Sequence, residues 1–442
     1  MSHFAALAAA LLASTTQPPA PVMQRRPAAQ APAPASVDAR AIVQRVRAII
    51  AERYVLPERR PALDAVLAEG LSSGRYAVSD PLALADRINA DLARVGRDRH
   101  LNFSFDPPRA AILAAARGDR TPRDMSGFER VRRQRNHGVA ELKLLPGNVR
   151  YMDYQHFDWI GDESRAALET ALRFLSGGDA IIIDLRQNGG GNVQAVQYLI
   201  SHFMEADRPL ITFYLNGAPA PDRVSTLREL TLPRMIGKPL YVLTSDRTGS
   251  AAEEFVGHVA GYRLGELVGA NTGGAGFSND LVPLEGGFIL SISVARAVLA
   301  STGKDWEAVG HAPTIAAPVE RAREVAHAHA LRRLAAAGGP DKALFEAMAL
   351  LFESRARPVT TALPLQAYAG TYGERIILVE DGRLMFQRAG GPKLAMIAVG
   401  PNRFVIETDP LSQFEFTVAG ASATGFELFR PDGSRATATR SN

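Results

Sequence analysis

A serine at the start of a predicted helix is the first group in this sequence that could do covalent chemistry. Ser250 lies in residues 248–254 (TGSAAEE), which follow a short apolar run typical of a buried strand. Free N–H groups at a helix start could hold an oxyanion beside such a hydroxyl, so a nucleophilic serine is one interpretation. An ordinary N-cap serine is the simpler interpretation when this segment is taken alone.

A glycine-rich segment, residues 184–191 (DLRQNGGG), follows the apolar run 180–183. Ligands bind at the carboxyl edge of open α/β sheets, and glycines let the backbone approach a substrate closely. The segment lacks the Lys-Ser/Thr pair of a nucleotide-binding P-loop, which argues against a phosphate loop.

A histidine and an acid complete the set of candidates. His100 lies in residues 98–103 (DRHLNF), at the junction between two predicted units, where clefts form. Glu307 lies in residues 304–313 (KDWEAVGHAP). Structural explanations compete with both, because a lone histidine is usually structural and a Trp-Glu pair can be packing plus a solvated acid.

The elements that must position these groups change character along the chain. Apolar residues at helix spacing predict a helical domain in residues 37–103, and alternating strands and helices predict an α/β core in residues 148–357. Short β-rich runs separated by turn pairs predict a small all-β domain in residues 363–442. Residues 104–147 are interpreted as an Arg-rich connecting region.

The first 36 residues predict a targeting segment rather than folded structure. The apolar run 4–13 has the length of a signal-peptide core and is too short to span a bilayer. A Pro/Ala-rich linker follows it to residue 36. We therefore expect export, to a bacterial periplasm, and no membrane span, although no Lys or Arg precedes the apolar run.

Composition removes several kinds of chemistry. The 442 residues contain no cysteine, which excludes disulfides, thiolate nucleophiles and Cys-ligated zinc. The nine histidines form no His-x-x-x-His pair with a nearby acid, so we expect neither a metal nor another cofactor. The net charge is +4, and a single aromatic residue, Phe128, lies among the arginines between 117 and 135, which favours a solvated surface over nucleic-acid binding.

In combination and in order, the four motifs resemble the tail-specific (C-terminal processing) serine peptidase family, in the branch of the tricorn protease core and interphotoreceptor retinoid-binding protein. The resemblance covers residues 37–353, and Glu307 follows Ser250 by 57 residues, close to the separation in tricorn-like members. The matching motifs are Asp-x-His at 98–100, Asp-Leu-Arg-x-Asn-x-Gly-Gly at 184–191, Ser-Ala-Ala-Glu at 250–253 and Trp-Glu-x-x-Gly at 306–310.

The resemblance implies a role for each candidate. Ser250 would attack the scissile carbonyl, and His100 would act as general base and then protonate the leaving amine. The backbone N–H groups of Gly190 and Ala251 would form the oxyanion hole. Glu307 would belong to the polar relay behind the histidine.

Two departures from the family pattern bear on this mechanism. Tricorn-like members have a serine just before the histidine, where this chain has Arg99, so Asp98 could orient His100 instead. The Ser-Lys branch has a lysine after the serine, where this chain has GAG at 274–276. A histidine mechanism must therefore carry any activity, and His258, on the serine's own helix, is the next candidate base.

The resemblance implies a crotonase-like (ClpP/crotonase) α/β core with an N-terminal helical bundle and a C-terminal small all-β domain. The expected function is a serine-type peptidase acting on peptide or unfolded-protein substrates, in an oligomeric state that the sequence leaves open. The stretch from His100 to Val149 is too short for the PDZ module of C-terminal processing enzymes. Two alternatives stay open: a catalytically weak or inactive binding module for an apolar ligand, like the retinoid-binding relatives, and an acyl-thioester enzyme.

Overall fold

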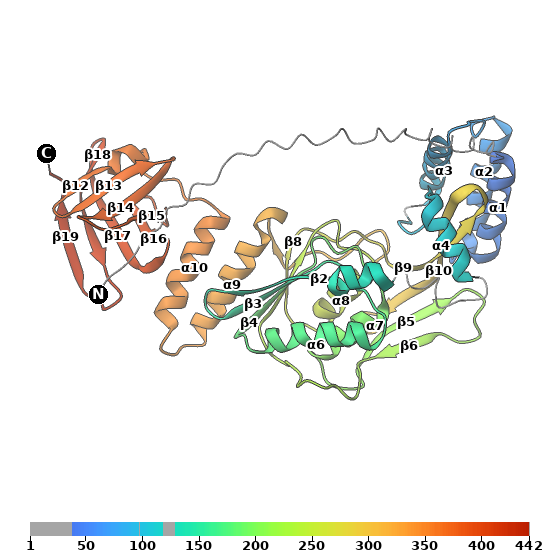
Figure 1. Cartoon of the computed structure of the whole chain (residues 1–442), viewed down its shortest axis with the longest axis horizontal. Coiled ribbons are helices and arrows are strands. Elements are labelled where there is room, and N and C mark those ends of the chain that lie inside the picture. The colour runs from blue at the N-terminus through green and yellow to red at the C-terminus, as the bar shows by residue number, and fades with distance from the viewer. Residues whose placement is uncertain (1–37, 97, 118–128, 442) are drawn as a thin grey trace, which may run out of the picture.

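The computed structural model describes residues 38–96, 98–117 and 129–441. The predicted signal peptide and linker at 1–36 lie outside these residues. Within them, no helix is both long and apolar enough to cross a membrane. Figure 1 shows helices at one end of the molecule, an α/β body in the middle and β-strands at the other end.

Three helices form the N-terminal unit, as the apolar spacing predicts. They are α1 (Ala39–Arg53), α2 (Arg60–Ser72) and α3 (Pro81–Val95), and α4 (Pro107–Arg117) follows them. The Asp80 carboxylate accepts a hydrogen bond from Leu82 N–H, which caps α3 directly before its N-terminal proline.

The helical unit does not bury its apolar stripes by itself. They pack against a second, antiparallel sheet in the order β1-β10-β5-β6, with β9 also paired to β10. This sheet was not predicted as a unit, because long stretches of chain separate β1 from the β5–β6 hairpin and that hairpin from the β9–β10 hairpin. Its strands are β1 (Asn102–Phe105), β5 (Pro209–Leu215), β6 (Asp222–Ser225), β9 (Phe277–Leu284) and β10 (Phe288–Leu299).

The central sheet has six strands in the order β11-β8-β7-β4-β3-β2 and is parallel except for the β2–β3 pair. The sheet begins before residue 148, where the α/β core was predicted to start. The prediction missed β2 because this largely exposed edge strand shows no apolar run in the sequence. Its strands are β2 (Val139–Leu145), β3 (Val149–Tyr154), β4 (Ala180–Asp184), β7 (Leu240–Thr244), β8 (Glu266–Gly269) and β11 (Ile315–Ala316).

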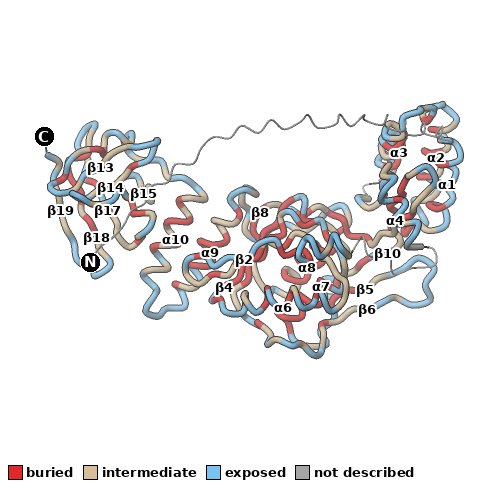
Figure 2. Tube along the Cα trace, in the orientation of Figure 1, coloured by how far each residue is buried: buried red, intermediate tan, exposed pale blue. Residues whose placement is uncertain are grey.

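Helices cover both faces of this central sheet, and the buried residues of Figure 2 are dense between them. One face carries α6 (Asp162–Ser176), α7 (Val193–Ser201) and α8 (Ala251–Gly261). The other face carries α9 (Ala322–Ala336), and α10 (Lys342–Ala356) packs on α9. Strands β4 and β7 are buried throughout, which explains why both read as continuous apolar runs.

The C-terminal unit is an eight-stranded antiparallel sheet in sequence order, β12 to β19. Ser441 N–H donates to the Thr371 carbonyl at 2.8 Å, which joins the end of the sheet to its first strand. The strands are β12 (Gly370–Tyr372), β13 (Arg375–Glu380), β14 (Arg383–Arg388), β15 (Lys393–Ala398), β16 (Arg403–Ile406), β17 (Asp409–Ala419), β18 (Ser422–Phe429) and β19 (Arg435–Thr439).

The C-terminal sheet encloses a core of its own. Its largest members are mutually packed aromatic rings, and all of its buried residues come from residues 368–428. An ion pair of 2.5 Å between Arg355 on α10 and Glu407 links the unit to the rest of the molecule.

We predict that the chain folds when it is shortened to end at Arg357, because the aromatic core beyond that residue contributes nothing to the buried core of the α/β body. The shortened chain should give a cooperative thermal transition by circular dichroism, and residues 358–442 expressed alone should give a second one. Failure of the isolated fragment to fold would show that α10 is part of the C-terminal unit.

Candidate active site

Ser250 sits in the turn that joins strand β7 to helix α8, with φ 52° and ψ −122°. This left-handed conformation favours glycine, and a non-glycine residue there costs about 1–3 kcal/mol. The turn places the serine at the carboxyl end of a parallel strand and at a helix N-terminus. Strain of this kind at a strand-to-helix turn is typical of an exposed nucleophile.

The strained turn is held by a carboxylate that the sequence analysis did not single out. Glu253 is completely buried, and its Oε2 accepts hydrogen bonds from the N–H groups of Ser250 at 2.9 Å and Ala275 at 2.7 Å. Its Oε1 accepts from Thr272 Oγ1 at 2.7 Å and Gly274 N–H at 2.6 Å. The Ser-x-x-Glu spacing of a capping box is the signal that could have identified it.

A second carboxylate binds the next part of the same loop. Glu307 Oε2 accepts from the N–H groups of Gly276 at 2.6 Å and Phe277 at 3.0 Å. Its Oε1 accepts from Arg99 N–H at 3.4 Å. A Cβ on Gly276 would lie 2.5 Å from Glu307 N, so glycine is required for this approach. Loop 272–277 therefore connects the turn of Ser250 to the segment that carries His100.

Asp98 and His100 lie beside Glu307, so the structure brings these three sequence-predicted residues together. One ligand atom from each lies within 4.8 Å of the other two. Asp98 Oδ1 accepts from the N–H groups of His100 at 2.9 Å and Leu101 at 3.1 Å, and from Ser293 Oγ at 2.9 Å. Within the described chain, the buried atoms Asp98 Oδ2 and His100 Nδ1 have no hydrogen-bond partner.

Burial sets the charges in this cluster. It lowers the pKa of His100 below the usual histidine value, and the negative charge of Asp98 opposes that shift. Burial, and then Asp98, raise the pKa of Glu307 to about 7, while its backbone hydrogen bonds act in the opposite direction. The imidazole is therefore neutral at neutral pH, as a general base requires, and Glu307 exchanges its proton in the same range.

The Gly-rich loop packs directly on the serine. A Cβ on Gly190 would lie 2.7 Å from the Cβ of Ser250 and 3.0 Å from Ala251 N. Gly190 N–H donates to Asn188 Oδ1 at 2.9 Å. This N–H, which was expected to bind the oxyanion, therefore already has a hydrogen-bond partner. Among the described residues, the N–H groups of Ala251 and Gly191 have no recorded acceptor.

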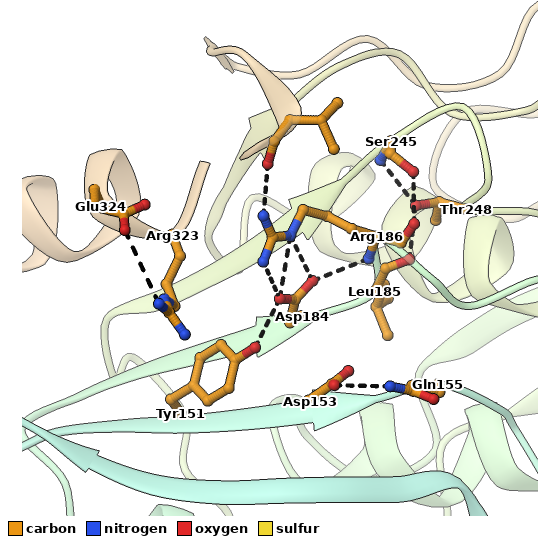
Figure 3. Close-up of polar contacts among 11 residues, drawn as sticks. Tyr151, Asp153, Gln155, Asp184, Leu185, Arg186, Ser245, Thr248, Arg323 and Glu324 are labelled. Atoms are coloured by element: carbon orange, nitrogen blue, oxygen red, sulfur yellow. Dashed lines mark hydrogen bonds and ion pairs between the residues drawn. The ribbon is translucent and has the colours of Figure 1, made fainter. Parts of the chain in front are cut away.

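The base of the Gly-rich loop is fixed by a buried ion pair, drawn in Figure 3. The Arg186 guanidinium contacts the Asp184 carboxylate at 2.6 Å and donates to the Val319 carbonyl at 2.5 Å. The Tyr151 hydroxyl donates to Asp184 at 2.7 Å from the neighbouring strand. The Asp184–Arg186 pair therefore orients the base of the Gly-rich loop.

Two hydroxyls tie this loop to the serine turn, as Figure 3 also shows. Ser245 Oγ donates to the Arg186 carbonyl at 2.6 Å, and Thr248 Oγ1 donates to the Leu185 carbonyl at 2.8 Å. Gly249 N–H donates to the Asn188 carbonyl at 3.0 Å. Hydrogen bonds therefore join the Gly-rich loop to the serine turn at three points.

His258 is placed where it cannot serve the serine as a base. It is completely buried on α8, with Nε2 3.5 Å from Glu254 Oε1. Burial raises the pKa of Glu254. Burial and then His258 lower the pKa of the adjacent His311 to about 4.

Two hollows lie near the candidate site. One, of about 490 Å³, is lined by Asp98, Arg99, Gly273, Ala308 and residues at the end of α3. The other, of about 460 Å³, begins at Val193 on the first turn of α7 and runs between β5, β6 and β10.

One cluster in the described chain is compact enough to hold a metal ion, and it is the trio of Asp98, His100 and Glu307. Imidazole and carboxylate are ligands that zinc accepts. A cation at this position would occupy the histidine that a base mechanism needs. Metal-independence therefore stays a prediction.

The comparisons with known proteins identify the family. Residues 148–317 match the model of peptidase family S41. Residues 35–131 match the N-terminal domain of S41 peptidases in eukaryotic IRBP. Together the two matches cover more than half of the 442 residues. The chain belongs to peptidase family S41.

Individual S41 relatives are distant in sequence. The carboxy-terminal processing protease CtpB of Bacillus subtilis (strain 168) is 27% identical over 180 residues, which is 40% of this chain and 36% of CtpB. The chain thus matches only about a third of the length of that relative.

Among solved structures, the photosystem II D1 C-terminal processing protease aligns with a TM-score of 0.41 and 18% identity, over 64% of this chain and 94% of that one. Mature CPAF in complex with lactacystin aligns with a TM-score of 0.44 and 12% identity, over 65% of this chain and 95% of that one.

We predict that Ser250→Gly is more stable than Ser250→Ala by about 1–2 kcal/mol, because only glycine relieves the left-handed strain. Urea unfolding of the two variants measures the difference. At Thr170, an exposed residue in the middle of helix α6, the order should reverse because glycine weakens a helix interior. Equal stabilities at position 250 would mean that the turn is not strained.

We predict that Glu307→Gln changes how stability depends on pH. A carboxyl whose pKa is raised on folding stabilises below its unfolded value of 4.5, and that contribution is lost as pH rises through about 7. The free energy of unfolding of the variant, relative to wild type, should therefore increase from pH 5 to pH 8.

Urea unfolding at both pH values tests this prediction. The matched control is Glu320→Gln, which removes an exposed carboxylate and should leave the pH dependence as in wild type. A relative stability of Glu307→Gln that stays constant or falls with pH would contradict the raised pKa.

Proposed function

We propose that the protein is a serine-type peptidase in which Ser250 is the nucleophile and His100 is the general base. The observation that carries the proposal is the strained β7–α8 turn at Ser250, joined through loop 272–277 to a cluster of Asp98, His100 and Glu307. Backbone strain of this kind clusters at active sites, which supports a functional role for Ser250.

In the proposed reaction, Ser250 Oγ bonds to the scissile carbonyl carbon while its proton passes to His100. The C–N bond then breaks, and His100 gives the proton to the leaving amine. Water, activated by the same imidazole, releases the acyl group and restores the serine. Because His100 Nδ1 is buried and has no hydrogen-bond partner in the described chain, we assign the proton transfers to Nε2.

The oxyanion in this proposal is held by the N–H of Ala251 and by the peptide at Gly190. The Gly190 N–H must leave Asn188 Oδ1 to take part, or the adjacent Gly191 N–H replaces it. In either case a side chain at position 190 is excluded by the short distance to Ser250. Donors of this kind are worth a hundred-fold or more in rate, on the order of 3 kcal/mol.

We assign Asp98 and Glu307 to orienting the imidazole and stabilising its protonated form. Asp98 raises the pKa of His100 against the effect of burial, which is the direction that helps a base accept a proton. Because the relay serine of tricorn-like members is replaced by Arg99, Glu307 is linked to this segment through the backbone N–H of that residue.

The proposed substrates are peptides or unfolded proteins, and the proposed core is the crotonase-like one expected from the resemblance. Export of the protein remains a proposal from the apolar run 4–13. The apolar-ligand module is the alternative, and no contact described above favours it over the enzyme.

We predict that a fluorophosphonate probe labels the purified protein at Ser250, as mapped by mass spectrometry of its peptides. Ser250→Ala should not be labelled, and peptide hydrolysis should fall by at least about a thousand-fold. Its stability should change by no more than about 1 kcal/mol, the value of a helix cap.

Two controls define the labelling experiment. Ser176→Ala, a change on the exposed end of α6, should be labelled like wild type, and EDTA should leave labelling unchanged. An unlabelled wild-type protein that binds apolar ligands would favour the binding module. Full hydrolysis by Ser250→Ala would overturn the nucleophile.

A further inference from the structure

In the cluster of Asp98, His100 and Glu307, each side chain has one ligand atom that the protein leaves without a strong partner. Asp98 Oδ2 and His100 Nδ1 are buried and have no hydrogen-bond partner within the described chain. Glu307 Oε1 has only the contact of 3.4 Å with Arg99 N–H, which is long for a hydrogen bond. Buried polar atoms are normally hydrogen-bonded, so these atoms are suited to a partner from outside the chain.

The other oxygen of each carboxylate is firmly held. Asp98 Oδ1 accepts from two backbone N–H groups and from Ser293 Oγ at 2.9 Å. Glu307 Oε2 accepts from the N–H groups of Gly276 at 2.6 Å and Phe277 at 3.0 Å. In metal sites, hydrogen bonds of this kind orient the ligands and set the affinity. Both carboxylates are therefore oriented before any ion binds.

The cluster also carries negative charge that no cation of the described chain offsets. Neither Asp98 nor Glu307 forms an ion pair among the described residues, whereas the buried Asp91 forms one at 2.5 Å. The nearby Tyr54 hydroxyl stays protonated, because burial and then Asp98 raise its pKa. A protonated imidazole would supply one positive charge to the two carboxylates, and a divalent cation supplies two.

We propose that Asp98, His100 and Glu307 bind a Zn²⁺ ion and that this ion reversibly inhibits the peptidase. Zinc accepts imidazole nitrogen and carboxylate oxygen at about 2.0–2.2 Å, and three protein ligands leave its fourth tetrahedral position to water. Ligand atoms of the three residues lie within 4.8 Å of one another. Two ligands of one tetrahedral ion lie about 3.4 Å apart, so the side chains need to close by about an ångström.

The donor set and its surroundings suit zinc. Magnesium and calcium take oxygen ligands, so an imidazole in the set favours a transition metal. The two carboxylates offset the double positive charge of the ion, which makes the occupied site neutral. Asp98 also lines the pocket of about 490 Å³ at the end of α3, which gives the ion an entrance from solvent.

Inhibition follows from the chemistry of the imidazole, and this half of the inference rests on the proposed function. In the proposed reaction, Nε2 of His100 accepts the proton of Ser250 Oγ, which requires the neutral ring to carry its hydrogen on Nδ1. An ion bound at Nδ1 displaces that hydrogen to Nε2. Nε2 then has no lone pair for the serine proton, and removal of the ion restores the base. The metal-free protein is thus the active form.

Zinc binding is measured on metal-free Ser250→Ala by competition with a chromophoric chelator, a readout that does not depend on activity. One ion should bind, and adding His100→Asn or Asp98→Asn should weaken binding by at least about 100-fold. Adding Ser293→Ala, which removes only a hydrogen bond to Asp98, should weaken it by about 10- to 100-fold. Circular dichroism checks that each variant is folded.

The matched control is His329→Asn, which removes an exposed histidine of α9 and should leave zinc affinity unchanged. In wild type, Zn²⁺ should suppress fluorophosphonate labelling at the concentrations that fill the site, and EDTA should restore it. Mg²⁺ at the same concentrations should have no effect. Ser293→Ala should need about 10- to 100-fold more zinc for the same suppression.

The outcomes separate this inference from the proposed function. If Ser250→Ala binds zinc no better than Ser250→Ala/His100→Asn, the metal site is wrong, and labelling of wild type at Ser250 still stands. If wild type is not labelled but the cluster binds zinc, the metal site stands and the peptidase assignment fails. Labelling of wild type that persists when the site is filled would overturn the inhibition.

Discussion

The site depends on one buried carboxylate that accepts four hydrogen bonds and has no cationic partner among the described residues. Glu253 receives the N–H of Ser250 and three donors from loop 272–275, and charge-assisted hydrogen bonds of this kind are worth about 1.5–3 kcal/mol each. The same carboxylate therefore stabilises the strained turn and fixes the loop. Without it, four donors would lose their acceptor, and the hydrogen bonds that join the turn of Ser250 to loop 272–275 through this carboxylate would be lost.

A second consequence follows for the acid–base cluster. Because Glu253 binds the N–H groups of Gly274 and Ala275, those of Gly276 and Phe277 are directed toward Glu307. These bonds favour the ionised form of Glu307, while burial and Asp98 disfavour it, and the balance leaves its pKa about 7. The loop thus links the position of the serine turn, through Glu253, to the charge of Glu307.

The sequence predicted the buried strands, the helices and the proximity of Asp98, His100 and Glu307, but not the contacts that hold them. Buried parallel strands appear in a sequence as continuous apolar runs, as β4 and β7 do. Glu253 instead resembled an ordinary first-turn acid. The Ser-x-x-Glu spacing accounts for its bond to Ser250 N–H, but its other three donors come from a loop about twenty residues later, which no local pattern encodes. The five-stranded sheet was missed for the same reason.

At position 99 the backbone, and not the side chain, contacts Glu307. In tricorn-like relatives a serine side chain at this position joins the relay, whereas here the backbone N–H of Arg99 contacts Glu307 and the loop supplies two further donors. A backbone donor does not depend on the side chain that the residue carries. The guanidinium is therefore free to extend past Gly273 toward the pocket that Arg99 lines.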